Sequence, residues 1–200
     1  MESPAPPSAP ELRVMVVDGD VERSRQLRGA LTLAGYHVVA ELKESLALPD
    51  AVRGLKPHIV IVAADSPDRD TLEHISVTTR DAPRPVVMFT QDGASESIRA
   101  AVQAGVSAYV VDGLAPDRLK SILDVACARF EAHQALADRL ADTERQLAER
   151  KQIEKAKGLL MKKRGLSEEA AFKELRNLAM QTGKPLGEVA DTLIAAAHLL

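Results

Sequence analysis

Short apolar runs alternate with amphipathic stretches over the first two thirds of the sequence, and this alternation restricts the fold more than any other feature. Each apolar run is short enough for one strand and is closed by turn residues, as in Leu12–Val17 (LRVMVV), which Asp18-Gly19-Asp20 follows. The strands are expected at Leu12–Val17, Tyr36–Ala40, His58–Ala63, Pro85–Thr90 and Val106–Val111. The helices are expected at Val21–Ala34, Leu46–Leu55, Arg69–Thr79, Ala94–Ala104 and from Pro116 onward. The sequence therefore predicts an α/β fold.

Five strands that alternate with five helices at this spacing predict a doubly wound, five-stranded parallel sheet of the flavodoxin-like kind. Local signals agree with the first unit of this pattern: Asp20 can cap the helix from Val21, and Gly35 suits its end. In such folds the functional crevice lies outside the carboxyl ends of the strands.

The composition excludes several classes of protein. Aromatic residues make up only 2% of the chain, so the core must consist of Ala, Leu, Val and Ile. The single cysteine, Cys127, cannot form an internal disulfide and gives no metal-binding spacing. Met1–Glu11 does not resemble a signal peptide, and no stretch approaches the ~20 apolar residues of a membrane helix. We expect a soluble, cytoplasmic protein with a disordered tail at 1–11, no membrane association, no metal and no cofactor.

A long helix is expected to follow the α/β part. Between Pro116 and Arg164 there is no proline and the only glycine is Gly158, which permits one continuous helix of about 49 residues. The residues Leu136, Leu140, Thr143 and Leu147 step by heptad spacings within it. This stripe covers barely two heptads, so a dimerising coiled-coil seam and a solvated connecting helix both remain open.

The last fifty residues predict a small helical unit. Ser167 can cap a second helix, Gly183 ends it, and Pro185 opens a third. The predicted buried stripes are Ile153, Ala156 and Leu160; Phe172, Leu175 and Ala179; and Val189, Leu193 and Ala196. Residues 151–200 carry nine basic against six acidic residues, a net charge of +3, whereas the first 150 carry −6. This asymmetry indicates a polyanion partner or a solvated helix face.

Residues 12–130 resemble a response-regulator receiver domain. The resemblance implies acids after the first strand for Mg²⁺, an aspartate ending the third strand as phosphate acceptor, a Thr or Ser after the fourth strand and a Lys after the fifth. The matching positions here are Asp18, Gly19, Ala63, Thr90 and Asp112. Only Asp18 and Thr90 keep the family's residue types, and the methyl group of Ala63 cannot attack phosphorus. We expect a degenerate pseudo-receiver domain that is not phosphorylated.

Three nearby acids need separate interpretations. Asp65 lies two residues beyond Ala63 and is a candidate surrogate acceptor, but it is expected past the strand end and without a cation partner. Asp18 and Asp20 are interpreted as a turn residue and a helix cap.

The C-terminal region resembles the ANTAR domain. The resemblance rests on Ile153–Met161, Arg164–Ser167, Ala170–Phe172, Leu175-Arg176, Ala179-Met180 and Val189-Ala190, in this order. It implies binding to paired stem-loops of leader mRNA and transcription antitermination. Asp112-Gly113, where Lys-Pro is usual, makes the chain most similar to the NasT-like, nitrate-assimilation branch. For that branch the resemblance implies inhibition by a nitrate-sensing partner protein rather than phosphorylation.

Basic residues in the last fifty positions are the candidate RNA contacts. Lys155 and Lys162 lie seven residues apart, hence on one helix face, and Gly158 between them would allow close approach by a partner or another helix. The predicted RNA-binding residues are Lys155, Lys157, Gly158, Lys162, Arg164, Lys173 and Arg176. Because Phe172 is expected on the buried stripe, base stacking would rest on arginine.

The sequence thus divides into a tail (1–11), a pseudo-receiver domain (12–130), a helical connector (131–150) and an ANTAR RNA-binding domain (151–200). The leading hypothesis is an RNA-binding antiterminator without enzyme activity, with a homodimer through the connector as a further possibility. A DNA-binding atypical response regulator and a protein–protein interaction module are the alternatives. The third helix is apolar and offers few side chains that read base edges, which counts against DNA.

Overall fold

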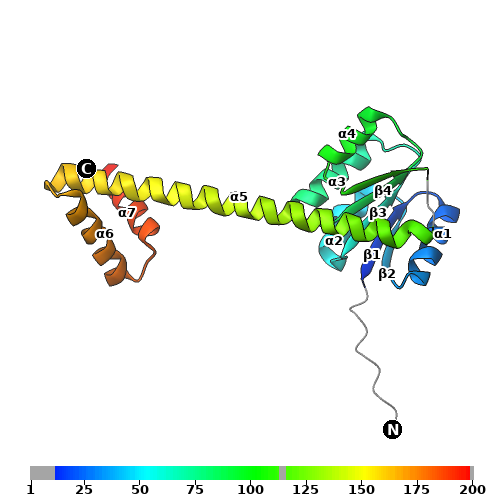
Figure 1. Cartoon of the computed structure of the whole chain (residues 1–200), viewed down its shortest axis with the longest axis horizontal. Coiled ribbons are helices and arrows are strands. Elements are labelled where there is room, and N and C mark those ends of the chain that lie inside the picture. Colours follow the sequence, from blue (N-terminus) through cyan, green and yellow to red (C-terminus); the bar gives the residue numbers. More distant parts are fainter. Residues whose placement is uncertain (1–11, 113–115, 199–200) are drawn as a thin grey trace, which may run out of the picture. The chain divides into compact units, whose positions relative to one another are not determined.

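The computed structural model describes residues 12–112 and 116–198 (Figure 1). The chain divides into two compact units, Met1–His133 and Gln134–Leu200. The expected tail at 1–11, and Gly113 of the Asp-Gly pair, lie outside the described residues.

The first unit contains the predicted five-stranded parallel sheet, and its strand order is β2-β1-β3-β4-β5. The strands are β1 (Arg13–Asp18), β2 (His37–Leu42), β3 (Ile59–Ala63), β4 (Val86–Thr90) and β5 (Ala108–Val111). The order reverses direction between β1 and β3, which is where a doubly wound sheet opens its crevice. The predicted fold class is confirmed.

Helices cover both faces of this sheet (Figure 1). They are α1 (Val21–Leu33), η1 (Ser45–Ala47), α2 (Leu48–Leu55), α3 (Arg69–Asp81), α4 (Ser95–Gln103) and the start of α5 (Pro116–Arg164). Successive strand side chains point to opposite faces. Val14 and Val16 therefore pack with α1 and α5, whereas Met15 and Val17 pack with α2, α3 and α4.

Several boundaries differ from the sequence prediction by one or two residues, and two of the differences have a clear cause. β2 continues two residues past Ala40, because Glu41 and Leu42 still pair with Val16 and Val17 of β1. The helix expected from Leu46 begins instead as the short 3₁₀ turn η1, and α2 starts at Leu48 with a proline in its first turn. Proline suits this position because the first amides of a helix have no partner within the helix.

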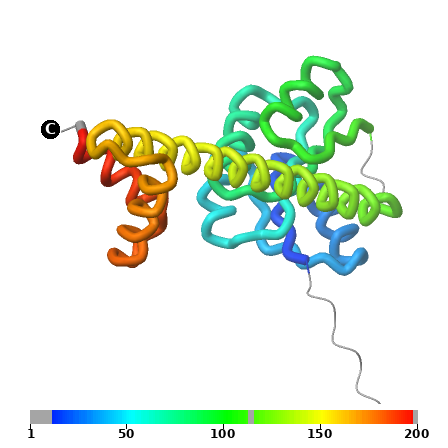
Figure 2. The backbone as a smooth tube through the Cα atoms, turned by 60° about the vertical axis from the view of Figure 1, so that its left-hand side comes forward, coloured from blue at the N-terminus to red at the C-terminus, as the bar shows by residue number. Residues whose placement is uncertain are grey.

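The second unit consists of the last part of α5 with α6 (Glu168–Thr182) and α7 (Leu186–His198), which lie beside it (Figure 2). Ser167 caps α6 as predicted, since its hydroxyl accepts a hydrogen bond from the Ala170 amide at 3.2 Å. Gly183 ends α6 in the left-handed conformation, with φ of 66°. The small core holds Ala156, Leu160, Ala171, Leu175, Val189 and Ala190.

The prediction that Phe172 is buried is wrong. Its side chain is 42% exposed, and Ala171 is the fully buried residue of that turn. An α-helix turns by roughly 100° per residue, so a stripe centred on Ala171 and Leu175 leaves Phe172 at its edge. Ala196, also expected in the core, is exposed, and Ala190 is buried in α7 instead.

No helix among the described residues is both long enough and apolar enough to cross a membrane.

Candidate receiver crevice and nucleic-acid interface

The five candidate crevice positions lie at one edge of the sheet. Asp18 ends β1 and pairs in register with Ala63, which ends β3. Thr90 ends β4, and Asp112 follows β5. Because all strands are parallel, their carboxyl ends lie at the same edge. The topology thus brings these positions together, with the buried methyl group of Ala63 beside Asp18.

The two acids after β1 already have structural partners. The Asp20 carboxylate caps α1 by accepting hydrogen bonds from the amides of Glu22 at 2.9 Å and Arg23 at 2.8 Å. The backbone hydrogen bond from Arg23 holds the pKa of Asp20 below its ordinary value. The buried Asp18 carboxylate accepts hydrogen bonds from the Asp20 amide at 2.9 Å and from the Arg23 side chain. The turn-and-cap interpretation of both acids is confirmed.

Asp65 has the cation partner that the sequence did not reveal. It lies past the end of β3, as expected, and its side chain is 78% exposed. Nη1 of Arg23 donates to its carboxylate at 2.5 Å. The expectation that Asp65 lacks a cation is therefore wrong, because the partner comes from α1, 42 residues earlier in the chain.

Hydrogen bonds tie the loop after β4 to its neighbours. The Thr90 hydroxyl donates to the Asp65 carbonyl at 2.9 Å and accepts from the Asp92 amide at 3.1 Å. The Asp92 carboxylate accepts from Ser97 at 2.6 Å and Ser66 at 2.9 Å, and the bond from Ser97 is the main cause of its lowered pKa. Asp112 is exposed and has a positive φ of 51°. Thr90 is thus held by backbone groups, and Asp112 offers no cation.

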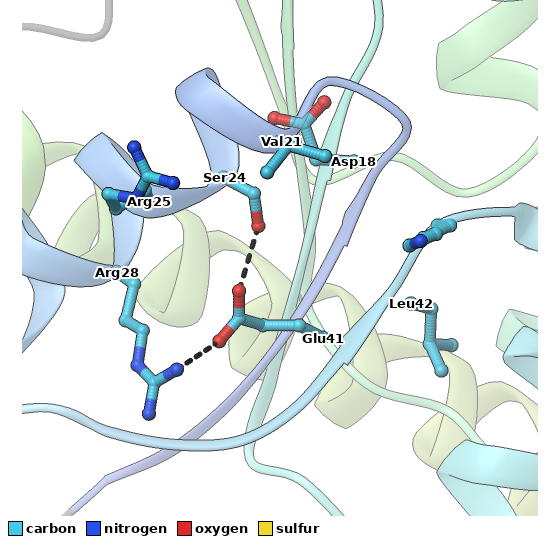
Figure 3. A pocket seen from close by; sticks show the side chains of 8 residues that line it. Asp18, Val21, Ser24, Arg25, Arg28, Glu41 and Leu42 are labelled. Carbon is cyan, nitrogen blue, oxygen red and sulfur yellow. Dashed lines mark hydrogen bonds and ion pairs between the residues drawn. The ribbon is translucent and has the colours of Figure 1, made fainter.

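A cavity of about 240 Å³ lies beside this crevice, between α1 and β2 (Figure 3). Its lining consists of Asp18, Val21, Ser24, Arg25, Arg28, Glu41, Leu42 and Lys43. Ser24 and Arg28 both point to Glu41, with hydrogen bonds of 2.9 and 2.8 Å to its two carboxylate oxygens (Figure 3). The Glu41 carboxylate in this cavity therefore already accepts hydrogen bonds from Ser24 and Arg28.

One face of α5 in the second unit carries free basic side chains. Lys155 and Lys162 are exposed and form no ion pair within the described residues. Gly158 lies between them, and a Cβ atom placed there would meet nothing within 4 Å. Glycine costs a helix interior about 1 kcal/mol relative to alanine. Because no other helix of the described chain approaches Gly158, the helix-packing explanation for this glycine finds no support, and the gap faces open space.

Lys157 and Arg164 are bound by carboxylates of their own unit. Lys157 is only 8% exposed, and its ammonium donates to Glu154 at 2.9 Å and to Glu168 at 2.7 Å. These two hydrogen bonds raise the pKa of Lys157, and the one donated to Glu168 is the larger cause. Arg164 forms an ion pair with Glu174. Lys157 therefore has little surface for a phosphate, and its predicted role is corrected to that of a link between α5 and α6.

The outer face of α6 joins a cationic and an aromatic group. Lys173 and Arg176 are exposed, opposite the buried stripe as expected, and form no ion pair within the described part of the chain. Phe172 lies four residues before Arg176, which places both on the same side of the helix. An exposed ring beside a guanidinium suits a flat, electron-rich partner such as a nucleobase. Sequence reasoning missed this exposed ring because it assigned Phe172 to the core.

Two family models match the chain. The response regulator receiver domain matches residues 14–124, which is more than half of the 200 residues. The chain belongs to the response regulator family. The ANTAR domain matches residues 141–194, so this response regulator carries an ANTAR domain in its second unit.

Two regulatory proteins are similar to this response regulator. The transcriptional regulatory protein PdtaR of Mycobacterium tuberculosis is 28% identical over 182 residues, which cover 91% of this chain and 89% of PdtaR. A nitrate regulatory protein of Klebsiella oxytoca is 41% identical over 73 residues, or 36% of this chain and 18% of that protein. Both are regulators by name, and membership of a regulatory family argues against enzyme activity.

Solved receiver structures share the fold of the first unit. A CheY-like receiver domain protein of Methanospirillum hungatei aligns with a TM-score of 0.54 at 18% identity, covering 62% of this chain and 98% of that chain. A LuxR-family response regulator from Aurantimonas aligns with a TM-score of 0.52 at 26% identity, covering 59% of this chain and 86% of that chain.

Proposed function

We propose that this response regulator is an RNA-binding transcription antiterminator that binds paired stem-loops in leader mRNA. The observation that carries the proposal is the set of exposed cations without ion pairs on α5 and α6 of the described chain, all within the ANTAR match. Phosphate groups dominate the affinity of proteins for nucleic acids, and free Lys and Arg side chains are their usual ligands.

The proposed interface has two parts with different tasks. On α5, Lys155 and Lys162 would bind the RNA backbone, and the bare Gly158 between them would let a phosphate or sugar approach the helix closely. On α6, Lys173 would bind phosphate while Arg176 and Phe172 would contact an unpaired base of a loop. Arg164 remains a candidate at the edge, since Glu174 must release it before it can bind RNA.

We further propose that the regulated genes serve nitrate or nitrite assimilation and that a nitrate-sensing protein inhibits the regulator. The similarity to a nitrate regulatory protein supports the pathway. Asp112 in the place of the usual Lys supports assignment to the NasT-like branch and control without phosphorylation. Ala63 supports the same conclusion, because a methyl group at the end of β3 cannot accept a phosphoryl group.

The proposed division of labour follows the sequence interpretation. Residues 12–130 would act as a pseudo-receiver that receives the partner's signal, and 151–200 would bind RNA. Residues 131–150 would connect the two and could pair with a second copy of the chain through their exposed leucines.

RNA binding is tested by substitution on α6. We expect Arg176→Ala and Phe172→Ala each to weaken binding of the full chain to a leader RNA with two hairpins by roughly tenfold to a hundredfold, because each removes a contact of about 1–3 kcal/mol. Gel shift or fluorescence anisotropy at two salt concentrations would measure this. Phe172→Ala should leave the salt dependence unchanged, since it removes no charge.

Arg145→Ala is the matched control. Arg145 is an exposed arginine of the connector that pairs with Asp142, outside the proposed interface, and its loss should leave the affinity unchanged. Equal affinity of all three variants and the unsubstituted chain would remove α6 from the interface. Stronger binding to duplex DNA than to the hairpin pair would favour a DNA-binding regulator instead.

A further inference from the structure

The guanidinium of Arg23 contacts two carboxylates at the mouth of the receiver crevice. Its Nε donates to one Asp18 oxygen at 2.9 Å and its Nη2 donates to the other at 2.8 Å, a two-pronged contact with a fully buried carboxylate. Its Nη1 donates to Asp65 at 2.5 Å. One side chain of α1 thus joins the end of β1 to the loop after β3.

We infer that Arg23 takes the place of the divalent cation in this crevice and makes it a site that excludes metal. Receiver domains hold Mg²⁺ beside the acid that ends β1, which is Asp18 here. In this chain the guanidinium of Arg23, which is always protonated, binds the same acid. The two-pronged contact is the usual geometry of an arginine–carboxylate pair.

The donors at this edge do not fit Mg²⁺. Magnesium requires six oxygen ligands at about 2.0–2.1 Å in octahedral arrangement, usually including one or two free carboxylates. Asp18 is bound by Arg23, the next position is Gly19, and Asp20 is bound by two amides of α1. The described chain contains no cluster of three or more acids, histidines or cysteines suited to a metal. Within it, every buried side-chain nitrogen and oxygen also has a hydrogen-bond partner.

The positive charge of Arg23 is needed to balance the buried Asp18 carboxylate, and Arg23 does not lose its proton. The Asp18 side chain is 0% exposed, and a buried carboxylate without a counter-charge is strongly destabilising. Hydrogen bonds to Asp18 raise the pKa of Arg23 further above its ordinary value, so it stays protonated at every physiological pH. A bound metal ion can leave the crevice, whereas this cation is part of the chain.

The contact continues into the loops that follow β3 and β4. The Asp65 carbonyl accepts from Thr90, the Thr90 hydroxyl accepts from the Asp92 amide, and the Asp92 carbonyl accepts from Tyr109 of β5 at 2.8 Å. A chain of hydrogen bonds therefore runs from Arg23 to the edge strand without any ligand. Arg23 therefore links α1, through Asp65, to the loops after β3 and β4.

Manganese titration of the full chain tests this role. We expect Arg23→Gln to bind Mn²⁺, followed by its electron paramagnetic resonance signal, at least about tenfold more tightly than the unsubstituted chain, because Asp18 and Asp65 become available. Adding Asp18→Asn to Arg23→Gln should abolish this site. Arg25→Gln is the matched control, since Arg25 lies on the same helix, is 70% exposed and, among the described residues, pairs only with Glu22.

Equal Mn²⁺ affinity of the unsubstituted chain and Arg23→Gln, whether both bind or neither, would overturn the inference. If Arg23→Gln fails to fold, nuclear magnetic resonance of the unsubstituted chain decides. Amide signals of Asp18 and Asp65 that do not move at about 10 mM Mg²⁺ support the inference, and saturable shifts overturn it.

This inference rests on the phosphorylation-independent part of the proposed function and not on RNA recognition. RNA affinity, measured on the same proteins, should be the same for the unsubstituted chain and Arg23→Gln, because the substitution lies in the first unit. Absence of RNA binding by all of them would contradict the proposed function while the Mn²⁺ comparison still decides the role of Arg23.

Discussion

A single ammonium group connects α5 to the start of α6. Lys157 donates to both oxygens of Glu154 at 2.9 and 3.0 Å, one turn earlier on α5, and to Glu168 at 2.7 Å. Glu168 is the first residue of α6, where a negative charge also interacts favourably with the helix dipole. Because the core of this unit is small, one ion-pair cluster contributes a larger share of its stability than it would in a large domain.

Replacing Lys157 should lower stability in a pH-dependent way. The pKa of Glu168 is lowered by Lys157, so its contribution is present above its ordinary pKa of 4.5 and is lost as the pH falls through the lowered value. The pKa of Lys157 is raised, so its contribution is present below 10.5 and is lost as the pH rises through the raised value. Lys157→Met should therefore melt a few degrees below the unsubstituted chain at pH 7, and this difference should shrink as the pH falls below 4.5.

Thermal unfolding followed by circular dichroism would measure the difference. Lys155→Met is the control, since Lys155 lies on the same helix, is exposed and has no ion pair within the described residues. It should keep the melting temperature and lose RNA affinity. A difference for Lys157→Met that does not shrink as the pH is lowered below 4.5 would contradict the electrostatic explanation.

The connector part of α5 carries a stripe of exposed leucines that a partner helix could bury. Leu136, Leu140 and Leu147 are 63%, 61% and 52% exposed, although leucine gains about 1.5–3 kcal/mol from full burial. All residues of α5 from 135 to 151 are exposed, so the described chain itself does not cover this stripe. Heptad spacing and charged flanks fit a second copy of the same helix.

Disrupting this stripe should separate a dimer into monomers. Leu140→Glu places two like charges in the seam and removes two buried leucines, so we expect the dimer dissociation constant to rise at least about a hundredfold. Sedimentation velocity of the full chain would measure it. Ala141→Glu, one residue further and off the heptad stripe, is the matched control. A chain that is monomeric without substitution would show that the connector is a solvated helix.

Whole elements were predictable where a local pattern decides them. Alternating runs placed the five strands, and the absence of proline between Pro116 and Arg164 predicted α5 at its full 49 residues. Which face of a helix is buried was harder to predict, because one residue, or about 100°, separates buried Ala171 from exposed Phe172. Partners from distant segments were not predictable, because no local pattern links Arg23 to Asp65, or Lys157 to Glu168 across the turn between two helices.

At the scale of the whole molecule, the proposed function joins an ANTAR unit to a receiver whose input is not a phosphoryl group. Phosphoryl transfer needs a free carboxylate oxygen aligned with the phosphorus and cations that neutralise the developing charge. The end of β3 offers the methyl group of Ala63, and the cation Arg23 is already paired with Asp18. The RNA-binding unit should then be active without any phosphoryl donor.

Incubation with acetyl phosphate and Mg²⁺ should therefore change neither the mass of the full chain nor its affinity for the hairpin pair. Intact-protein mass spectrometry and the binding assay would measure both. Asp65→Asn tests whether Asp65 can accept the phosphoryl group, because Asp65 is an exposed carboxylate close to the crevice. An acyl-phosphate that forms on the unsubstituted chain and is lost in Asp65→Asn would make Asp65 a surrogate acceptor. Arg23 would then have to release Asp65 before each transfer, and phosphorylation would act by breaking the contact between α1 and the loop after β3.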